Sequence, residues 1–193
     1  MSVPMTQEKP QKVPRILPLP ESQWSGEVRE LLAKASSAGE DKPLNIFTTL
    51  ARHPKLFKRW MVFAAHVLSK STLPPREREL VILRIGWLCR SHYEFHQHKR
   101  IGLACGLSRD EIRRVTAPLP DGWSDRDRAL IRATDELHAD RTISDQTWSE
   151  LRETWSEQQL FDLVFTVGQY TLVSMVLNTL GVQTEDGSEG FAS

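Results

Sequence analysis

Cysteine is scarce in this sequence, since only Cys89 and Cys105 occur among 193 residues. Two cysteines in or beside apolar sequence cannot form a disulfide framework, and they are typical of small buried side chains in a reducing compartment. Net charge is also absent, because 25 basic residues balance 25 acidic ones. The chain therefore has no global field that would recruit nucleic acid or an anionic membrane, and we expect neither as a partner.

Two further absences narrow the class of protein. No segment shows sustained alternation of apolar and polar residues, so we predict an all-α fold. Residues 1–20 are interrupted by prolines and charges and lack the apolar core of a signal peptide, which favours a cytoplasmic location. We expect an extended N-terminal arm at 1–20, a single domain at 21–183 and a flexible tail at 184–193.

Serine and proline signals divide this domain into helices. Capping boxes are expected at Ser108 with Glu111 and at Ser156 with Gln159, each at the start of a helix. The helix predicted from Pro74-Pro75 to about residue 88 is apolar on nearly all sides. Such a helix is buried centrally in the fold or between subunits.

The final predicted helix, which ends at Leu180, has enough apolar residues to cross a bilayer. Asp162, Gln169 and Asn178 interrupt it, however, and a helix of this kind in a soluble chain is usually a core helix or part of an oligomer interface. We therefore predict that it packs within the protein.

The stretch SHYEFHQHKRIG, from Ser91 to Gly102, places three histidines and a glutamate within eight residues. His92 and His96 share one face of a helix, and Glu94 and His98 share another about 200° away, so the four cannot converge on one ion. The chain also lacks HExxH and paired CxxC motifs. We predict no metal or cofactor, although a metal-dependent lyase or hydrolase that uses His92, His96 or His98 stays open as an alternative.

Acid–base chemistry fits this stretch better. Ser91, Glu94 and His98 follow one helical stripe, and a carboxylate beside an imidazole can hold the tautomer that proton transfer requires. Glu79 shares a stripe with apolar residues of the preceding helix, so its carboxylate is expected to point inward, where it needs a partner. The alternatives are a solvated Glu94–His98 pair on the surface and a Glu79 that only complements the helix dipole.

Several other side chains are candidates for a substrate pocket. Tyr170 and Gln169 interrupt the final apolar helix and could reach the pocket, and Trp60 and Phe47 could form an aromatic wall. Core packing explains all three aromatic residues equally well. His138 fits a cap at the end of its helix.

The segment LPPRERELVILRIGWLCRSHYEFHQHKRIGLACGLSRDEIRRV, residues 73–115, resembles the carboxymuconolactone decarboxylase family, which also contains peroxidases of the alkyl hydroperoxidase D type. PLNIFTTLARHP before it and LVFTVGQYTLVSMVLNTLGV after it are similar to the same group, so the resemblance covers roughly residues 15–183. It implies an alkyl hydroperoxidase D-like helical bundle that assembles into a homo-oligomer, a trimer or a hexamer, through helices like the one at 73–88.

The peroxidase branch of this family carries a Glu, then CxxC twelve residues later, then a His four residues after the second Cys. Glu79 and His98 match this pattern, but Ser91 and Glu94 stand where the two cysteines would be. Disulfide cycling needs two thiols at that spacing. The departure therefore excludes thiol peroxidase activity and points to a thiol-free subgroup.

The decarboxylase branch implies a cofactor-independent lyase or isomerase that acts on a small carbonyl or lactone acid. In this interpretation His98 delivers a proton to carbon, Glu94 orients or charges His98, and Glu79 holds the network from the adjacent helix. Ser91 would bind a substrate oxygen, with Tyr170, Trp60 and Phe47 lining the pocket. The alternative on the same scaffold is a non-catalytic small-molecule binder or structural oligomer.

Overall fold

The computed structural model describes residues 13–36, 42–117, 122–185 and 187. Residues 1–12 of the predicted arm and most of the predicted tail lie outside these ranges. Within them the regular structure is entirely helical, as the absence of strand patterns predicted. The elements are η1 (Glu21–Gln23), α1 (Gly26–Ala35), α2 (Asn45–Leu50), α3 (Pro54–Ser69), α4 (Pro75–Leu88), α5 (His92–Ala104), α6 (Arg109–Arg114), α7 (Asp125–Asp140), α8 (Asp145–Arg152) and α9 (Glu157–Leu180).

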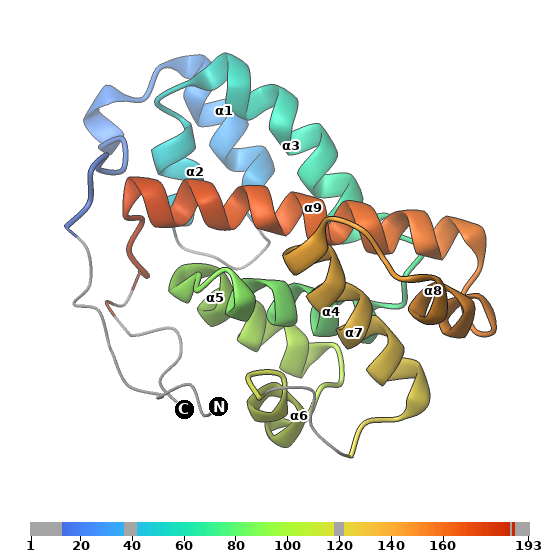
Figure 1. The fold of residues 1–193 in the computed structure, drawn as a ribbon. Coiled ribbons are helices and arrows are strands. Elements are labelled where there is room, and N and C mark those ends of the chain that lie inside the picture. The colour runs from blue at the N-terminus through green and yellow to red at the C-terminus, as the bar shows by residue number, and fades with distance from the viewer. Residues whose placement is uncertain (1–12, 37–41, 118–121, 186, 188–193) are drawn as a thin grey trace.

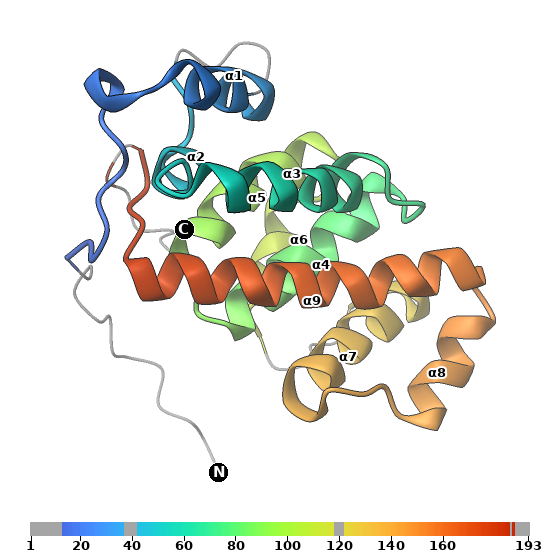
Figure 2. The same cartoon turned by 90° about the horizontal axis from the view of Figure 1, so that it is seen from above.

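The long helix α9 runs across the molecule between two groups of helices. Helices α1, α2 and α3 lie on one side of it, and α4 to α7 lie on the other, with α8 near its N-terminal end (Figure 1). The view from above shows α3 alongside α9 (Figure 2). Separate clusters of buried apolar side chains fill the first group, around Phe57, and the space where α4, α7 and α9 meet, around Ile82 and Leu163.

Local capping signals determine where most helices begin. Both predicted capping boxes are confirmed, because Ser108 and Ser156 accept hydrogen bonds from the backbone of Glu111 and Gln159, whose side chains accept from the serine backbone in return. Proline occupies the first turn of α3 and of α4, where its missing N–H would have no partner within the helix.

Helix α4 is the centre of the fold. Nine consecutive residues, from Arg78 to Gly86, are buried inside a single chain. The prediction left open whether this helix is buried in the fold or between subunits, and the structure places it in the fold.

The two ends of the described chain pack against each other. The backbone N–H of Arg15 donates to the carbonyl of Leu180 at 2.8 Å, and Gly181 ends α9 with a φ of 71°. A side chain at Gly181 would meet the backbone of Val13 and Pro14 at 3.1 Å, so both the conformation and the close approach require glycine.

The described residues that follow α9 pack against the body of the protein. Thr184 is buried, and the carboxylate of Glu185 accepts hydrogen bonds from the Asn45 backbone N–H at 2.8 Å, from the Tyr93 hydroxyl at 2.7 Å and from Gln97 Nε2 at 2.5 Å. Glu185 thereby joins α2 to α5.

Among the described residues, one helix is long and apolar enough to cross a membrane by length and composition, and that helix is α9. Half of its most apolar window is buried inside the protein. A core helix passes the same test. Its packing against α3, α4, α5 and α7 agrees with the prediction that it lies within the protein.

The guanidinium of Arg84 connects α4 to α6 and α7. It donates to both carboxylate oxygens of Asp135, at 2.6 and 2.8 Å, and to the carbonyl oxygens of Val115 and Ala117, at 2.5 and 2.8 Å. Only 4% of Arg84 is exposed. Arg84 therefore provides hydrogen bonds to two backbone carbonyl oxygens and to one carboxylate.

We expect Arg84→Ala to lower the free energy of unfolding by about 3 kcal/mol, because it leaves a partly buried carboxylate and two carbonyls unpaired. Urea denaturation followed by circular dichroism measures this loss. Arg113→Ala, which breaks the exposed pair with Asp110, is the control and should cost less than about 1 kcal/mol. Equal losses in both variants would contradict a structural role for Arg84.

Candidate active site

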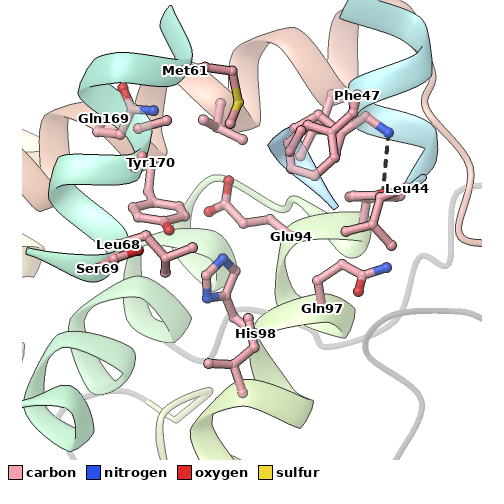
Figure 3. Close-up of a pocket in the computed structure, with 18 of the residues that line it drawn as sticks. Leu44, Phe47, Met61, Leu68, Ser69, Glu94, Gln97, His98, Gln169 and Tyr170 are labelled. Atoms are coloured by element: carbon pink, nitrogen blue, oxygen red, sulfur yellow. Dashed lines mark hydrogen bonds between the residues drawn. The ribbon is translucent and has the colours of Figure 1, made fainter. Parts of the chain in front are cut away.

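A cavity of about 610 Å³ lies between α1 to α3 on one side and α5 and α9 on the other. Most of its wall is apolar, from residues such as Leu44, Met61 and Leu68 (Figure 3). Glu94, His98 and Tyr170 contribute polar groups at its centre. A largely apolar cavity of this size with a few convergent polar groups is typical of a small-molecule site.

His98 is held in place from behind by Glu79. His98 Nδ1 lies 2.7 Å from Glu79 Oε2, and the other Glu79 oxygen accepts from Arg78 Nε at 3.3 Å. Glu79 is fully buried and does not line the cavity, whereas His98 does. The Glu79 carboxylate beside Arg78 can only accept a hydrogen bond, so the proton of a neutral His98 imidazole lies on Nδ1. His98 Nε2 then has no hydrogen-bond partner among the described residues.

Glu94 lines the same cavity one turn before His98 on α5. Its oxygens accept from the Ser174 hydroxyl of α9 at 3.2 and 3.1 Å, and no other described residue forms a hydrogen bond with it. A side chain at Gly86 would lie 3.1 Å from Glu94 Oε1, so this glycine of α4 makes room for the carboxyl group. Burial raises the pKa of Glu94 well above its usual range, and the Ser174 hydrogen bond opposes this only in part.

Tyr170 packs edge-on against the His98 ring, with ring centroids 4.8 Å apart and planes at 87°. It lines the cavity, and its hydroxyl forms no hydrogen bond with a described residue. Burial and the nearby Glu79 and Glu94 raise its pKa well above the ordinary value, so the phenol stays protonated and can donate. The structure brings Tyr170 into the pocket together with Glu94 and His98.

Phe47 and Trp60 lie in the cavity wall, and each also stacks on the fully buried Phe57, at centroid distances of 6.0 and 6.4 Å. The two predicted roles of Phe47 and Trp60, in core packing and in the wall of the pocket, are therefore compatible. They belong to the packing of α2 and α3, and one side of each faces the cavity.

Ser91 does not line this cavity. It is fully buried at the N-cap of α5, and its hydroxyl has no hydrogen-bond partner among the described residues. The position of Ser91 therefore does not support the predicted contact with a substrate oxygen. Ser91 lies at the junction between α4 and α5. His92, His96 and His138 also lie outside the cavity lining.

Two partners in the site were missed by the sequence analysis. Arg78 pairs with Glu79, and Ser174 pairs with Glu94. A small polar residue one turn after Tyr170 in an otherwise apolar helix was a usable signal for Ser174, whereas nothing marked Arg78 among the several charges that begin α4. Gln169 also reaches the cavity, and its buried Oε1 has no hydrogen-bond partner within the described ranges.

The arrangement presents two proton-transfer groups of different character to one space. A neutral carboxyl at Glu94 can donate a hydrogen bond to a substrate oxygen, and Nε2 of His98 can accept or return a proton. Among the described residues, the glutamate that forms a hydrogen bond with His98 is Glu79, whereas Glu94 forms its hydrogen bonds with Ser174. Within the described ranges, no group of three or more His, Cys, Asp or Glu side chains is placed to hold a metal ion.

These helices and this cavity define an all-α protein with an AhpD-like fold. Residues 54–136, which include Glu79, Glu94 and His98, match the model of the carboxymuconolactone decarboxylase family. The predicted alkyl hydroperoxidase D-like fold is thus confirmed, and the family model matches the central segment on which the resemblance rests. No curated protein matches the sequence.

Solved structures share the fold at low sequence identity. A peroxidase-related protein from Ralstonia eutropha JMP134 has a TM-score of 0.79 and 18% identity, over 94% of this chain and 99% of that one. A second, from Silicibacter sp. TM1040, has a TM-score of 0.78 and 12% identity, over 95% and 100%. The debrominase Bmp8, in a variant bound to 2,3,4-tribromopyrrole, has a TM-score of 0.75 and 11% identity, over 89% and 92%.

The raised pKa of Glu94 predicts a pH-dependent stability. The folded protein binds the Glu94 proton more tightly than the unfolded chain does. The resulting contribution to the free energy of unfolding is therefore complete below about pH 4, and it is lost as the pH rises through the pKa of Glu94 in the folded protein. Glu94→Gln removes the titrating group. We therefore expect the variant to be more stable than the parent near about pH 8, with the difference shrinking toward about pH 5.

Urea unfolding of both proteins across this pH range measures the effect. Glu153→Gln, at an exposed position in the α8–α9 connection, is the matched control and should show no comparable trend. A difference between Glu94→Gln and the parent that does not change with pH would contradict a neutral Glu94.

Proposed function

We propose that the protein is a cofactor-independent lyase or isomerase that transfers protons beside the carbonyl group of a small carbonyl or lactone acid. The observation that carries this proposal is the pair formed by Glu94 and His98, which line one cavity while Glu79 orients His98 from behind. Decarboxylation, isomerisation and elimination beside a carbonyl all need such a pair of groups.

The mechanism uses the two groups in complementary ways. The Glu94 carboxyl donates a hydrogen bond to the substrate carbonyl oxygen and stabilises the negative charge that develops there. His98 Nε2 takes a proton from the adjacent carbon, or delivers one to it after CO₂ has left. The Glu79 carboxylate stabilises the imidazolium that forms, and Tyr170 keeps the ring from rotating.

The walls of the cavity support a small ring acid as substrate. Its apolar side chains suit a flat hydrocarbon or heterocyclic body, and two exposed cations in its lining, Lys34 and Arg100, can attract a carboxylate. The related fold of Bmp8 holds a brominated pyrrole, which is also a small flat ring. The two peroxidase-related neighbours do not change the proposal, because neither Cys89 nor Cys105 lines the cavity.

We further propose that the protein belongs to a thiol-free subgroup, acts in the cytoplasm away from nucleic acid and membranes, and assembles into a homo-oligomer, a trimer or a hexamer. The support for assembly is an exposed apolar surface along the seam of α3 and α9. It consists of Val62, Phe63, Phe161, Phe165 and Leu172, which are 39–74% exposed. Phe63 and Phe165 contact each other edge to face on this surface. We call it the α3–α9 patch.

A panel of unsaturated γ-lactone acids and β-keto acids tests the activity, with CO₂ release and solvent deuterium incorporation at carbon as readouts. We expect His98→Gln and Glu94→Gln each to lower turnover by about 10²-fold or more, because each removes a proton-transfer group. Both variants should keep the parent circular dichroism spectrum. Ser91→Ala, outside the cavity, is the control and should keep nearly full turnover.

Other outcomes would favour one of the alternative functions. Full turnover in His98→Gln would end the acid–base assignment. Tight binding of a ring acid with neither CO₂ release nor deuterium incorporation would favour a non-catalytic binder. Stoichiometric zinc, iron or manganese, together with turnover that a chelator abolishes, would favour a metal-dependent enzyme.

Substitution in the α3–α9 patch tests assembly. We expect Phe165→Glu to shift the protein to a smaller species in size-exclusion chromatography with light scattering, because burying a charge in an apolar contact is costly. Leu103→Glu, at an exposed apolar residue of α5, is the control and should leave the mass unchanged. A parent protein that is monomeric, or a Phe165→Glu variant of parent mass, would contradict an oligomer through this patch.

A further inference from the structure

The active-site cavity is larger than a small ring acid. It measures about 610 Å³, whereas a cavity of about 150 Å³ is large enough to bind benzene. A six-membered ring with its carboxyl group therefore fills roughly a third of the space. The remainder has to hold either water molecules or another part of the substrate.

The wall that α3 contributes favours another part of the substrate. Its apolar side chains in the lining recur at the spacing that places residues on one face of a helix. We call this face the α3 stripe, and it consists of Trp60, Met61, Ala64, Ala65 and Leu68. The other α3 residue in the lining is Ser69, which ends the helix. Apart from the Trp60 indole N–H, the stripe carries no strong hydrogen-bonding group, and a buried water needs two to four polar partners. The stripe therefore suits hydrocarbon better than water.

The α3 stripe is incompletely buried by the protein itself. Phe57 and Val67 of the same helix pack into the core and are 0% and 2% exposed. Trp60, Met61 and Leu68, in contrast, are only half-buried. An apolar ligand along this wall would cover their remaining exposed area, and covering apolar area favours binding.

The length of the α3 stripe indicates the length of such a ligand. From Trp60 to Leu68 the helix advances about 12 Å, and an extended chain advances roughly 1.2 Å per bond. A chain of about eight to ten carbons therefore follows the stripe from end to end. Ala64 lies at the middle of the stripe, where its small side chain leaves room for this chain.

The polar groups of the site lie across the cavity from the α3 stripe. Glu94 and His98 project from α5 and Tyr170 projects from α9. Met61 and Leu68 project into the same cavity from α3 (Figure 3). The cavity thus has one side for a reacting ring and another side for hydrocarbon.

We propose that the substrate is a ring acid with an apolar side chain of about six to ten carbons. Its ring meets Glu94 and His98, and its side chain lies along the α3 stripe over Ala64. The position of the ring rests on the proposed function. The position of the side chain rests on the length and the apolar character of the stripe.

Binding of unreactive acids tests the side chain without any turnover. The 4-alkylbenzoic acids carry a ring, a carboxyl group and a chain of chosen length, and calorimetric titration gives their Kd. From benzoic acid to 4-octylbenzoic acid we expect Kd to fall about twofold or more per methylene, and to level off for longer chains. A Kd that stays within about twofold across this series would overturn the proposal.

Ala64→Phe blocks the middle of the α3 stripe. We expect it to raise the Kd of 4-octylbenzoic acid about tenfold or more, and to change that of benzoic acid by less than about twofold. Ala139→Phe is the matched control, because it adds the same side chain at an exposed position of α7 outside the cavity lining. A parent-like Kd of 4-octylbenzoic acid in Ala64→Phe, or an equal rise in both variants, would contradict the proposal.

Met61→Gln repeats the test with little change of volume, so that a folding defect in Ala64→Phe does not decide the result. We expect the Kd of 4-octylbenzoic acid to rise about threefold or more, because a polar amide then faces the hydrocarbon chain. Binding of benzoic acid should stay as in the parent. If Met61→Gln leaves the Kd of both acids unchanged, the chain does not lie along α3 and the proposal fails.

Turnover separates the side chain from the proposed function. Ring lactone acids with side chains of increasing length are compared in the parent and in His98→Gln. Loss of turnover in His98→Gln, together with a parent kcat/KM that does not depend on chain length, would overturn the side chain and leave the function standing. Full turnover in His98→Gln, with the chain-length dependence of Kd intact, would end the acid–base function and leave the α3 stripe as the wall of a site for lipophilic acids.

Discussion

The hydrogen bond between Glu79 and His98 is the interaction on which the candidate site depends. It joins α4, the most buried helix, to α5, and it compensates a fully buried carboxylate that would otherwise destabilise the fold. It also sets the rotation of α5, which turns Glu94 toward the same cavity over the space left by Gly86. One contact thus connects the stability of the core to the geometry of the site.

The two glutamates differ because their partners differ. Glu79 faces a guanidinium and an imidazole, whereas Glu94 faces only a hydroxyl in an otherwise apolar setting. Desolvation therefore acts on Glu94 with little compensation, and its carboxyl group keeps its proton. Placing two carboxyl groups in unlike environments is a general way for a protein to hold an acid and a base near one another at neutral pH.

The helices were predictable because their signals are local. Proline in the first turn, serine caps and apolar periodicity each act within a few residues, and α4, α6 and α9 begin where these signals stand. Tertiary pairing was harder to predict. Spacing placed Glu94 and His98 on one stripe of α5, but it could not show that Glu79 would hold His98 or that Ser174 would reach Glu94. Those contacts depend on how α4 and α9 pack against α5.

The carboxylate of Glu185 gives the end of the chain a direct influence on the pocket. By accepting from Asn45, Tyr93 and Gln97, it ties α2 to α5, and Tyr93 and Gln97 also line the active-site cavity. The relative position of these two walls is thus set by a residue some ninety positions later than α5 in the chain. Removing residues 185–193 would break these three hydrogen bonds and loosen the pocket, although α9 ends at Leu180.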